Sequence, residues 1–210
     1  MIGYELFLIG DDAVAIRPDE RQLRHPLARV LRQGGDWIDV VPGKEVVAVR
    51  FDPMQLLPSQ ALQSVFDWLE SFQPDESPVL EAIDLHLDVS SASAPDLALL
   101  AGANGLTPSA FLDRIANSRL CVDMLGFTPG FAYVEGVDTR LHAERLATPR
   151  QRVQAGSVGM VSGQLGLYGL AGPGGWPVIG RLTETLFDPK RSKPFLLQEG
   201  QAIRLHLAGL

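Results

Sequence analysis

Glycine is concentrated in one stretch of this chain, between residues 156 and 180. Nine glycines fall within it, at positions 156, 159, 163, 166, 169, 172, 174, 175 and 180. A helix is not sustained at that density, because each interior glycine costs about 1 kcal/mol relative to alanine. Bent strands and close backbone packing use glycine instead. We therefore expect short strands of a small β-barrel from about residue 120 onward.

The first eighty residues predict a different architecture, a small α/β unit. Apolar stretches at Tyr4–Ile9 and Ala13–Arg17 flank a Gly-Asp-Asp turn, which predicts a hairpin. The expected elements that follow are a helix over 23–31, strands over 37–41 and 46–51, and a helix over 62–72. The order β-β-α-β-β-α predicts a small ferredoxin-like unit. Because the polar, proline-containing stretch 73–78 follows it, we predict domains at residues 1–78 and 79–210.

The start of the second domain predicts one strand and two short helices. Residues 79–89 have the pattern of a strand, with His86 and Asp88 on one face. Pro95 suits the first turn of a helix, and Thr107 and Pro108 form an N-cap and first helical position for the next. The expected fold class is therefore α+β, with a ferredoxin-like α/β domain before a β-barrel domain.

Charge and hydropathy exclude several classes of partner. The formal net charge is −7, whereas nucleic acids and anionic membranes both require a positive surface. The modest basic cluster formed by Arg140, Arg145, Arg150 and Arg152 would serve only a small anion. No apolar run approaches the ~18 residues of a membrane span, and the first residues lack the pattern of a secretory signal. We expect a cytoplasmic protein.

The sequence predicts neither a metal site nor a nucleotide site. Cys121 is the only cysteine and lies in an apolar run, which favours a buried, inert thiol. The four histidines are far apart in sequence and form no metal-binding pair. The segment 155–159 lacks the Gly-x-Ser-x-Gly nucleophile elbow, and no P-loop or dinucleotide motif is present. We expect this chain to bind no cofactor, and any ATP to be held by a partner.

Two segments place aromatic residues among glycine and proline. They read GFTPGFAY over 126–133 and GPGGWPVIGR over 172–181. Such loops can wall a pocket, with aromatic faces as apolar surface and Arg181 as a carboxylate ligand. Alternatively, both are structural turns with buried aromatic rings, and composition alone slightly favours that alternative.

The order and spacing of these segments resemble the KipI family, whose members are named as a subunit of 5-oxoprolinase or as allophanate hydrolase subunit 1. The similarity runs from about Asp96 to the C-terminus. The matching motifs are GFTPGFAY at 126–133, TPR at 148–150, VQAGSV at 153–158, GQLGLY at 163–168, PGGW at 173–176, GR at 180–181 and LFD at 186–188. Each motif alone is weak, whereas the ordered set is specific.

The resemblance implies a cyclophilin-like β-barrel behind a small α+β domain, related to the carboxyltransferase portion of urea carboxylase. Members of the family act with a homologous KipA-type subunit and a LamB/YcsF-type subunit. Together these subunits open 5-oxoproline to glutamate at the expense of ATP. One branch of the family instead inhibits a sporulation histidine kinase.

Candidate site residues follow from the resemblance and from side-chain chemistry. We expect the arginines to hold a carboxylate or phosphate, the tyrosines and the glutamine to hydrogen-bond, and Phe131 and Trp176 to form walls. For each residue a purely structural role remains the alternative. The expected catalytic residues are Arg150, Gln164 and Arg181, and the expected substrate-binding residues are Phe131, Tyr133, Tyr168, Gly174, Gly175 and Trp176.

The chain departs from the family pattern at several positions. Ile115 and Leu120 replace a histidine and a tyrosine of the pattern, which removes two groups able to transfer protons or hydrogen-bond. Further departures are Asp88-Val89, Glu144, Gln154 and Gly172. Three hypotheses therefore stand: one component of a 5-oxoprolinase, a regulatory module without catalysis, and a protein related to allophanate hydrolase or urea carboxylase. Biotin-dependent carboxyl transfer ranks last, because it needs a biotin carrier and a carboxylase module.

Overall fold

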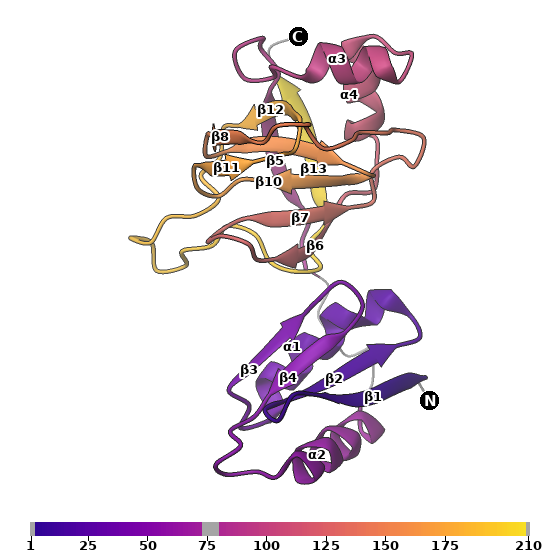
Figure 1. Cartoon of the computed structure of the whole chain (residues 1–210), viewed down its shortest axis with the longest axis vertical. Helices are drawn as coiled ribbons and strands as arrows, with labels where there is room; N and C mark the ends of the chain where they lie inside the picture. The colour runs from indigo at the N-terminus through magenta and orange to yellow at the C-terminus, as the bar shows by residue number, and fades with distance from the viewer. Residues whose placement is uncertain (1–2, 73–79, 209–210) are drawn as a thin grey trace. The chain divides into compact units, whose positions relative to one another are not determined.

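A computed structural model of the protein describes residues 3–72 and 80–208 (Figure 1). The chain divides into two compact units, Met1–Val79 and Leu80–Leu210. The boundary segment expected at 73–78 lies outside the described residues. Within the described residues, no helix combines the length and the apolar character needed to cross a membrane.

The first unit is a four-stranded antiparallel sheet with two helices. Its elements are β1 (Tyr4–Ile9), β2 (Ala13–Pro18), a short 3₁₀ turn η1 (Arg21–Leu23), α1 (Arg24–Gly34), β3 (Asp39–Pro42), β4 (Val47–Arg50) and α2 (Pro58–Glu70). The strand order is β1-β2-β4-β3, and all neighbouring strands are antiparallel. Moving β1 to the end of this order gives the β-α-β-β-α-β order of a ferredoxin-like unit.

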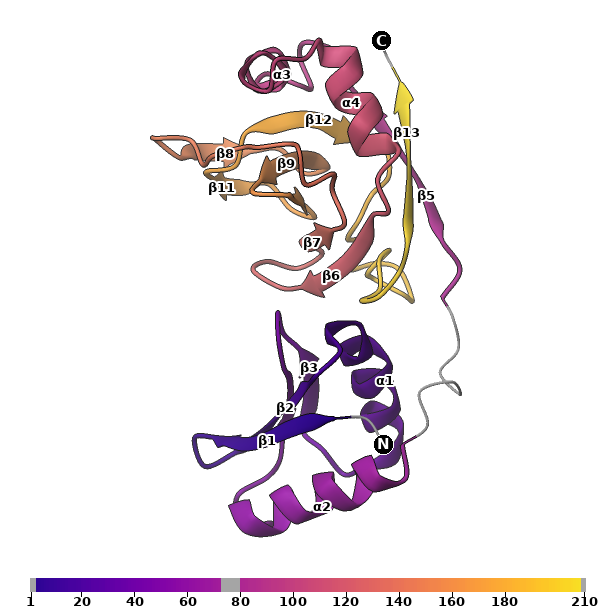
Figure 2. The same ribbon diagram turned by 90° about the vertical axis from the view of Figure 1, so that its right-hand side faces the viewer.

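The first unit is held by one apolar core between its sheet and its helices. Alternate residues of β2 and β4, such as Val14 and Val49, are fully buried and point to the same face of the sheet. Leu27 of α1 and Val65 of α2 pack in the same cluster, so both helices cover that face (Figure 2). The hairpin, the helices and the strands expected in this region are confirmed, with ends that differ by a few residues.

The second unit is built on a strongly curled seven-stranded sheet. Its order is β13-β5-β12-β9-β10-β7-β6. The strands are β5 (Ile83–Asp88), β6 (Cys121–Leu125), β7 (Ala132–Glu135), β9 (Ser157–Val161), β10 (Gln164–Leu167), β12 (Val178–Leu182) and β13 (Ile203–Ala208). A two-stranded ribbon, β8 (Arg150–Val153) with β11 (Gly172–Gly174), accompanies this sheet (Figure 1).

The two edges of the curled sheet meet at one point. Cys121 at the start of β6 forms an isolated bridge with Ala202, immediately before β13. Beside it, the N–H of Ile203 donates to the carbonyl of Leu120 at 2.9 Å. The sheet is thus a half-barrel that closes at this corner and stays open elsewhere. Cys121 is only partly buried, so the expectation of a buried thiol is wrong at this closing corner.

Two helices, α3 (Leu97–Ala103) and α4 (Pro108–Ala116), pack against β12 and β13. The N-cap expected for α4 is confirmed, because Thr107 Oγ1 accepts a hydrogen bond from the N–H of Ala110 at 3.2 Å. Phe111 of α4 is fully buried with Met160 and Leu165 of the sheet. The inner face of the half-barrel is therefore filled by its own apolar side chains and by those of the two helices. The outer face is not covered by these helices.

Two of the histidines lie side by side, although they are distant in sequence. Strands β5 and β13 pair in parallel with His206 opposite His86, and the two rings stack with centroids 5.2 Å apart. His86 also contacts Glu184, and His206 contacts Asp84, each at 2.7 Å. These two histidines are thus far apart in sequence, as noted above, but adjacent in space because β5 and β13 pair. Among the described residues, no group of three metal-binding side chains forms.

Candidate functional site

The outer face of the half-barrel carries a row of four residues, one on each of four neighbouring strands. Strand register places Tyr133 of β7 opposite Gly166 of β10, Gly166 opposite Gly159 of β9, and Gly159 opposite Val178 of β12. Since the two central members have no side chain, the row forms a trough with Tyr133 and Val178 at its ends.

Trp176 lies in this trough. A methyl group on Gly159 would come within 2.8 Å of its Cβ, and one on Gly166 within 3.0 Å of its Cε3. The first distance is shorter than real side-chain carbons show and the second is unusually tight, so the indole occupies space that two side chains would otherwise fill. The glycines of this region thus allow aromatic rings to pack closely against the strands. The glycine density of the sequence predicted close packing, but not which residues would pack there.

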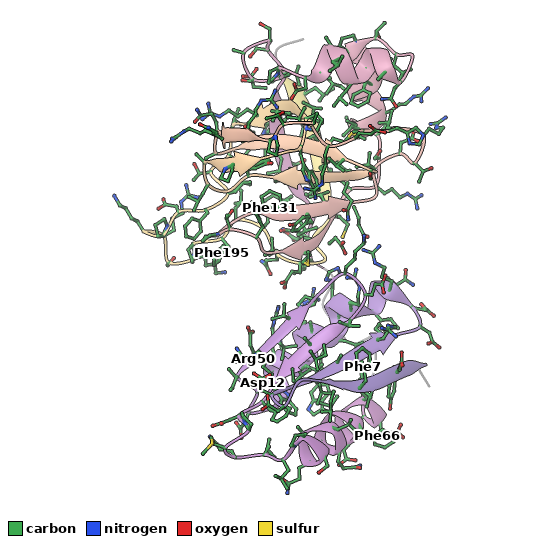
Figure 3. All side chains as sticks on the ribbon, viewed as in Figure 1. Phe7, Asp12, Arg50, Phe66, Phe131 and Phe195 are labelled. Carbon is green, nitrogen blue, oxygen red and sulfur yellow. The ribbon has the colours of Figure 1, made fainter. Side chains whose placement is uncertain are left out.

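Phe131 is the centre of an aromatic cluster on the same face (Figure 3). Its ring is edge-on to those of Tyr133 and Tyr168, with centroids 4.8 Å and 5.1 Å away. Trp176 lies at 6.5 Å and Phe127 at 5.3 Å, also edge-on. Edge-to-face contacts at these distances are favourable for aromatic pairs. The rings therefore support one another and form a packed aromatic wall on this face.

These rings line a small, partly open cavity of about 160 Å³. All six substrate-binding residues expected from sequence contribute to its lining. The lining residues are Phe127, Phe131, Tyr133, Arg145, Tyr168, Pro173, Gly174, Gly175 and Trp176. Sequence analysis missed Phe127, Arg145 and Pro173 as lining residues, although all three lie in or beside the motifs that it identified.

Arg145 brings the positive charge of the site. Its guanidinium carbon lies 5.9 Å from the centroid of the Trp176 ring, a cation–π contact. The next residue, Leu146, donates its N–H to the carbonyl of Gly175 at 2.8 Å, which fixes this segment beside the cavity. Within the described part of the chain, the guanidinium has no ion pair or hydrogen bond. Its donors are therefore available to an anion.

Two phenol groups also reach the cavity. Tyr168 is 3% exposed, and its hydroxyl lies against Gly174. Burial raises the pKa of Tyr168, and the positive charges of Arg145 and Arg150 oppose that effect. A tyrosine is protonated at neutral pH even with its ordinary pKa of about 10, and the raised pKa of Tyr168 reinforces this, so its hydroxyl can donate a hydrogen bond. Neither Tyr168 nor Tyr133 has a hydrogen-bond partner for its hydroxyl among the residues that the structure describes.

Arg150 has a different environment from Arg145. Its two terminal nitrogens donate to the two carboxylate oxygens of Asp96, each at 2.8 Å. The same carboxylate accepts the N–H of Val178 at 2.6 Å. This bidentate pair joins β8 to the start of α3 and to β12, and Arg150 does not line the cavity. A substrate carboxylate would have to displace Asp96 to use this guanidinium.

Gln164 and Arg181 also lie outside the cavity lining. Gln164 begins β10 at the β9–β10 turn and shares the outer face with Gly166, two residues further along. Arg181 on β12 is exposed and donates from Nε to the carbonyl of Ala155 at 3.1 Å. The structure therefore brings together the expected binding residues and leaves the three expected catalytic residues around them.

A family model described as the carboxyltransferase domain, subdomain C and D, matches residues 5–197. The chain belongs to this family. Two relatives of the chain are each named as a subunit of 5-oxoprolinase. The protein of Escherichia coli O157:H7 is 33% identical over 204 residues, which cover 94% of this chain and 93% of the relative. That of Bacillus subtilis strain 168 is 29% identical over 222 residues, with 97% and 92% covered.

Solved structures carry the same fold within longer chains. TTHA0988 is 28% identical with a TM-score of 0.78, and the match covers all of this chain and 40% of that one. This chain thus spans less than half of that protein. Kluyveromyces lactis urea carboxylase is 15% identical with a TM-score of 0.68, covering 98% of this chain and 22% of the enzyme. That similarity shows a shared mixed α+β fold with a curled sheet, whereas the cyclophilin-like subtype stays a prediction.

Proposed function

We propose that this chain is the substrate-binding subunit of an ATP-dependent 5-oxoprolinase, which opens 5-oxoproline to glutamate. It acts in the cytoplasm with a KipA-type and a LamB/YcsF-type subunit, and those partners hold the ATP. The observation that carries the proposal is the aromatic-walled cavity, lined by one guanidinium and two phenols that have no polar partner among the described residues. The names of the two relatives support the choice of reaction.

The cavity suits a small, flat, anionic ligand. A volume of about 160 Å³ equals roughly five water molecules, each with a share of ~30 Å³. 5-Oxoproline is a five-membered lactam ring with one carboxylate, a compact molecule of this class. Arg145 can bind that carboxylate with two parallel hydrogen bonds. Phe131 and Trp176 then contact the two faces or edges of the ring.

The phenols supply the polar contacts at the reacting end. A lactam is resonance-stabilised, so its carbonyl needs activation before water attacks. In the ATP-dependent reaction water adds to the carbonyl carbon, the ring C–N bond breaks with a proton going to its nitrogen, and ADP and phosphate are released. The activating step before the addition of water is transfer of the γ-phosphoryl group of ATP to the carbonyl oxygen. Protonated Tyr168 and Tyr133 donate hydrogen bonds to that oxygen, which favours charge on it, and the buried rings keep bulk water away. Arg145 holds the other end of the ring so that the carbonyl faces the phenols.

The three residues expected to be catalytic take supporting roles in this proposal. Arg150 and Asp96 hold β8, and through it β11, which carries Pro173 and Gly174 into the cavity wall. Arg181 and Gln164 lie on the same outer face, beyond the bound ring. The departures from the family pattern at Ile115 and Leu120 concern buried positions, 0% and 3% exposed, away from the cavity lining.

The test measures ligand binding and turnover separately. Calorimetric titration of the chain with 5-oxoproline should show binding, and Arg145→Ala should weaken it at least about tenfold, the effect of losing charged hydrogen bonds. Arg152→Ala is the matched control, because this exposed arginine of β8 does not line the cavity. 2-Pyrrolidone, which lacks the carboxylate, should bind wild type and Arg145→Ala equally.

Turnover is then measured with the KipA-type and LamB-type proteins co-expressed with this chain. ATP-dependent release of glutamate should need all three proteins and should fall in Arg145→Ala with folding intact. A verified complex that neither binds 5-oxoproline nor hydrolyses it would contradict the proposal.

A further inference from the structure

A second, larger depression lies beside the aromatic cavity. It measures about 440 Å³ and is formed mainly by the loop between β6 and β7. We call it the loop groove; its lining residues are Leu125, Gly126, Phe127, Thr128, Pro129, Gly130 and Phe195. Phe127 lines both the loop groove and the aromatic cavity, so a molecule in the groove would contact one residue of the cavity wall.

Phe127 is held in an unfavourable backbone conformation with its ring in solvent. Its φ is +69°, and the N–H of Thr128 donates to the carbonyl of Gly126 across it at 2.9 Å. This three-residue turn with positive φ is rare and strained, above all for a bulky residue. The ring is nevertheless 66% exposed. The edge-on contact with Phe131 covers only part of this residue, and an interface that covers the rest gives a further reason to retain the strained backbone.

Phe195 completes the apolar rim from a different segment, between β12 and β13 (Figure 3). It is 49% exposed, and its ring lies 5.1 Å from that of Phe187, to which it is also joined by a β-bridge. Single exposed apolar residues are ordinary, but several around one groove mark an interaction site. Aromatic residues are also enriched at the buried centre of protein interfaces.

We infer that the loop groove is the docking site for the second subunit of the enzyme, which inserts an apolar loop between Phe127 and Phe195. The inference rests on the proposed function. The occupant is a protein, because relatives are named as one subunit of an enzyme and TTHA0988 carries this fold in 40% of a longer chain. Because Phe127 lines both the groove and the cavity, that subunit would contact a residue of the ligand-site wall.

The experiment separates docking from ligand binding by a change at Phe195, which lines the groove and not the cavity. Phe195→Ala should weaken binding of the purified KipA-type protein at least about tenfold, as loss of an aromatic anchor does. Phe66→Ala is the matched control, a phenylalanine of α2 with similar exposure, 41% (Figure 3). Affinity is measured by sedimentation velocity, and 5-oxoproline binding by calorimetry on each variant alone.

The inference is supported if Phe195→Ala binds the partner more weakly but still binds 5-oxoproline. The control Phe66→Ala should bind the partner with wild-type affinity. Wild-type partner affinity in Phe195→Ala overturns the inference, as does self-association of the chain that Phe195→Ala abolishes, since the occupant is then a second copy. If Phe195→Ala binds the partner more weakly and no protein, wild type included, binds 5-oxoproline, the docking site is supported and the proposed substrate is wrong. If Phe195→Ala does not fold, hydrogen exchange is measured on the wild-type complex. Binding of the partner should then protect the backbone amides at 125–130 and around 195, and a lack of such protection overturns the inference.

Discussion

The two faces of strand β10 are packed in different ways. On the inner face, Leu165 and Leu167 are buried in an aliphatic core shared with both helices of the unit. On the outer face, Gly166 has no side chain, and Tyr168 beside it places its hydroxyl at a cavity. The inner face is filled by the strand's own side chains. The outer face is filled by rings from other segments, and it keeps a space.

This difference separates stability from binding along a single strand. Removal of a side chain from the inner face leaves a void in a packed core, which lowers the free energy of unfolding. Addition of a side chain to the outer face fills the space intended for rings and ligand. The three predictions below use neighbouring positions in and beside β10, so differences between them cannot be attributed to different regions of the fold.

Leu165→Ala should have the largest effect on stability. Leu165 is 1% exposed, and loss of a buried leucine costs about 2–5 kcal/mol. Urea denaturation should show a lower midpoint, while the fraction that stays folded binds 5-oxoproline with wild-type affinity. Leu99→Ala, at an exposed position of α3, should change the unfolding free energy by less than about 0.5 kcal/mol. Loss of affinity in folded Leu165→Ala would contradict the separation of the two faces.

Gly166→Ala should reverse the relative size of the two effects, with a moderate loss of stability and a large loss of ligand affinity. The new methyl carbon would lie 2.8 Å from Cζ of Phe131 and 3.0 Å from Cε3 of Trp176. Overpacking of this kind costs about 1–3 kcal/mol, and the rings can relieve it only by moving into the cavity. Denaturation and calorimetric titration of the same sample measure both effects.

The control for Gly166→Ala is Gly102→Ala in α3, where a methyl group would meet no atom within 4 Å other than those of its own helix backbone and chain neighbours. Helix propensity predicts that this control is more stable than wild type, by up to about 1 kcal/mol, with unchanged binding. Equal behaviour of the two glycine variants would show that the trough under Trp176 is not a determinant of the site.

The aromatic part of the site was predicted from the ordered motifs that resemble a family, and not from composition. Composition alone slightly favoured structural turns with buried rings, and Phe131 and Trp176 are indeed buried, 4% and 8% exposed. The same two rings also line the cavity, which composition did not indicate. The helices and hairpins of both units follow from local patterns, since caps and apolar spacing act over a few residues.

The arginine roles could not be predicted, because they depend on partners distant in sequence. Arg150 is paired by Asp96, a carboxylate 54 residues earlier, whereas Arg145 has no such partner among the described residues. No local pattern distinguishes the two side chains, and both lie in the same basic cluster. The stacking of His86 on His206 has the same origin, since it depends on the parallel pairing of β5 with β13.

Tyr168→Phe should have the smallest effect on stability and still weaken binding. The phenol oxygen has no hydrogen-bond partner in the described structure, so its removal leaves no buried group unpaired and should change the unfolding free energy by less than about 1 kcal/mol. If the hydroxyl contacts the ligand, its loss should reduce 5-oxoproline affinity by up to about tenfold. Unchanged affinity would assign the hydrogen bond to Tyr133 alone.

The raised pKa of Tyr168 adds a pH dependence that the phenylalanine variant must lack. Burial raises the pKa, so the folded state holds the proton more tightly than the unfolded state does. The resulting stability is complete below the unfolded pKa of about 10 and is lost as the pH rises through the higher folded value. Wild type should therefore lose both stability and ligand affinity at alkaline pH more steeply than Tyr168→Phe. Parallel curves for the two proteins would mean that Tyr168 does not titrate in the site, and the hydrogen-bond role would pass to another group.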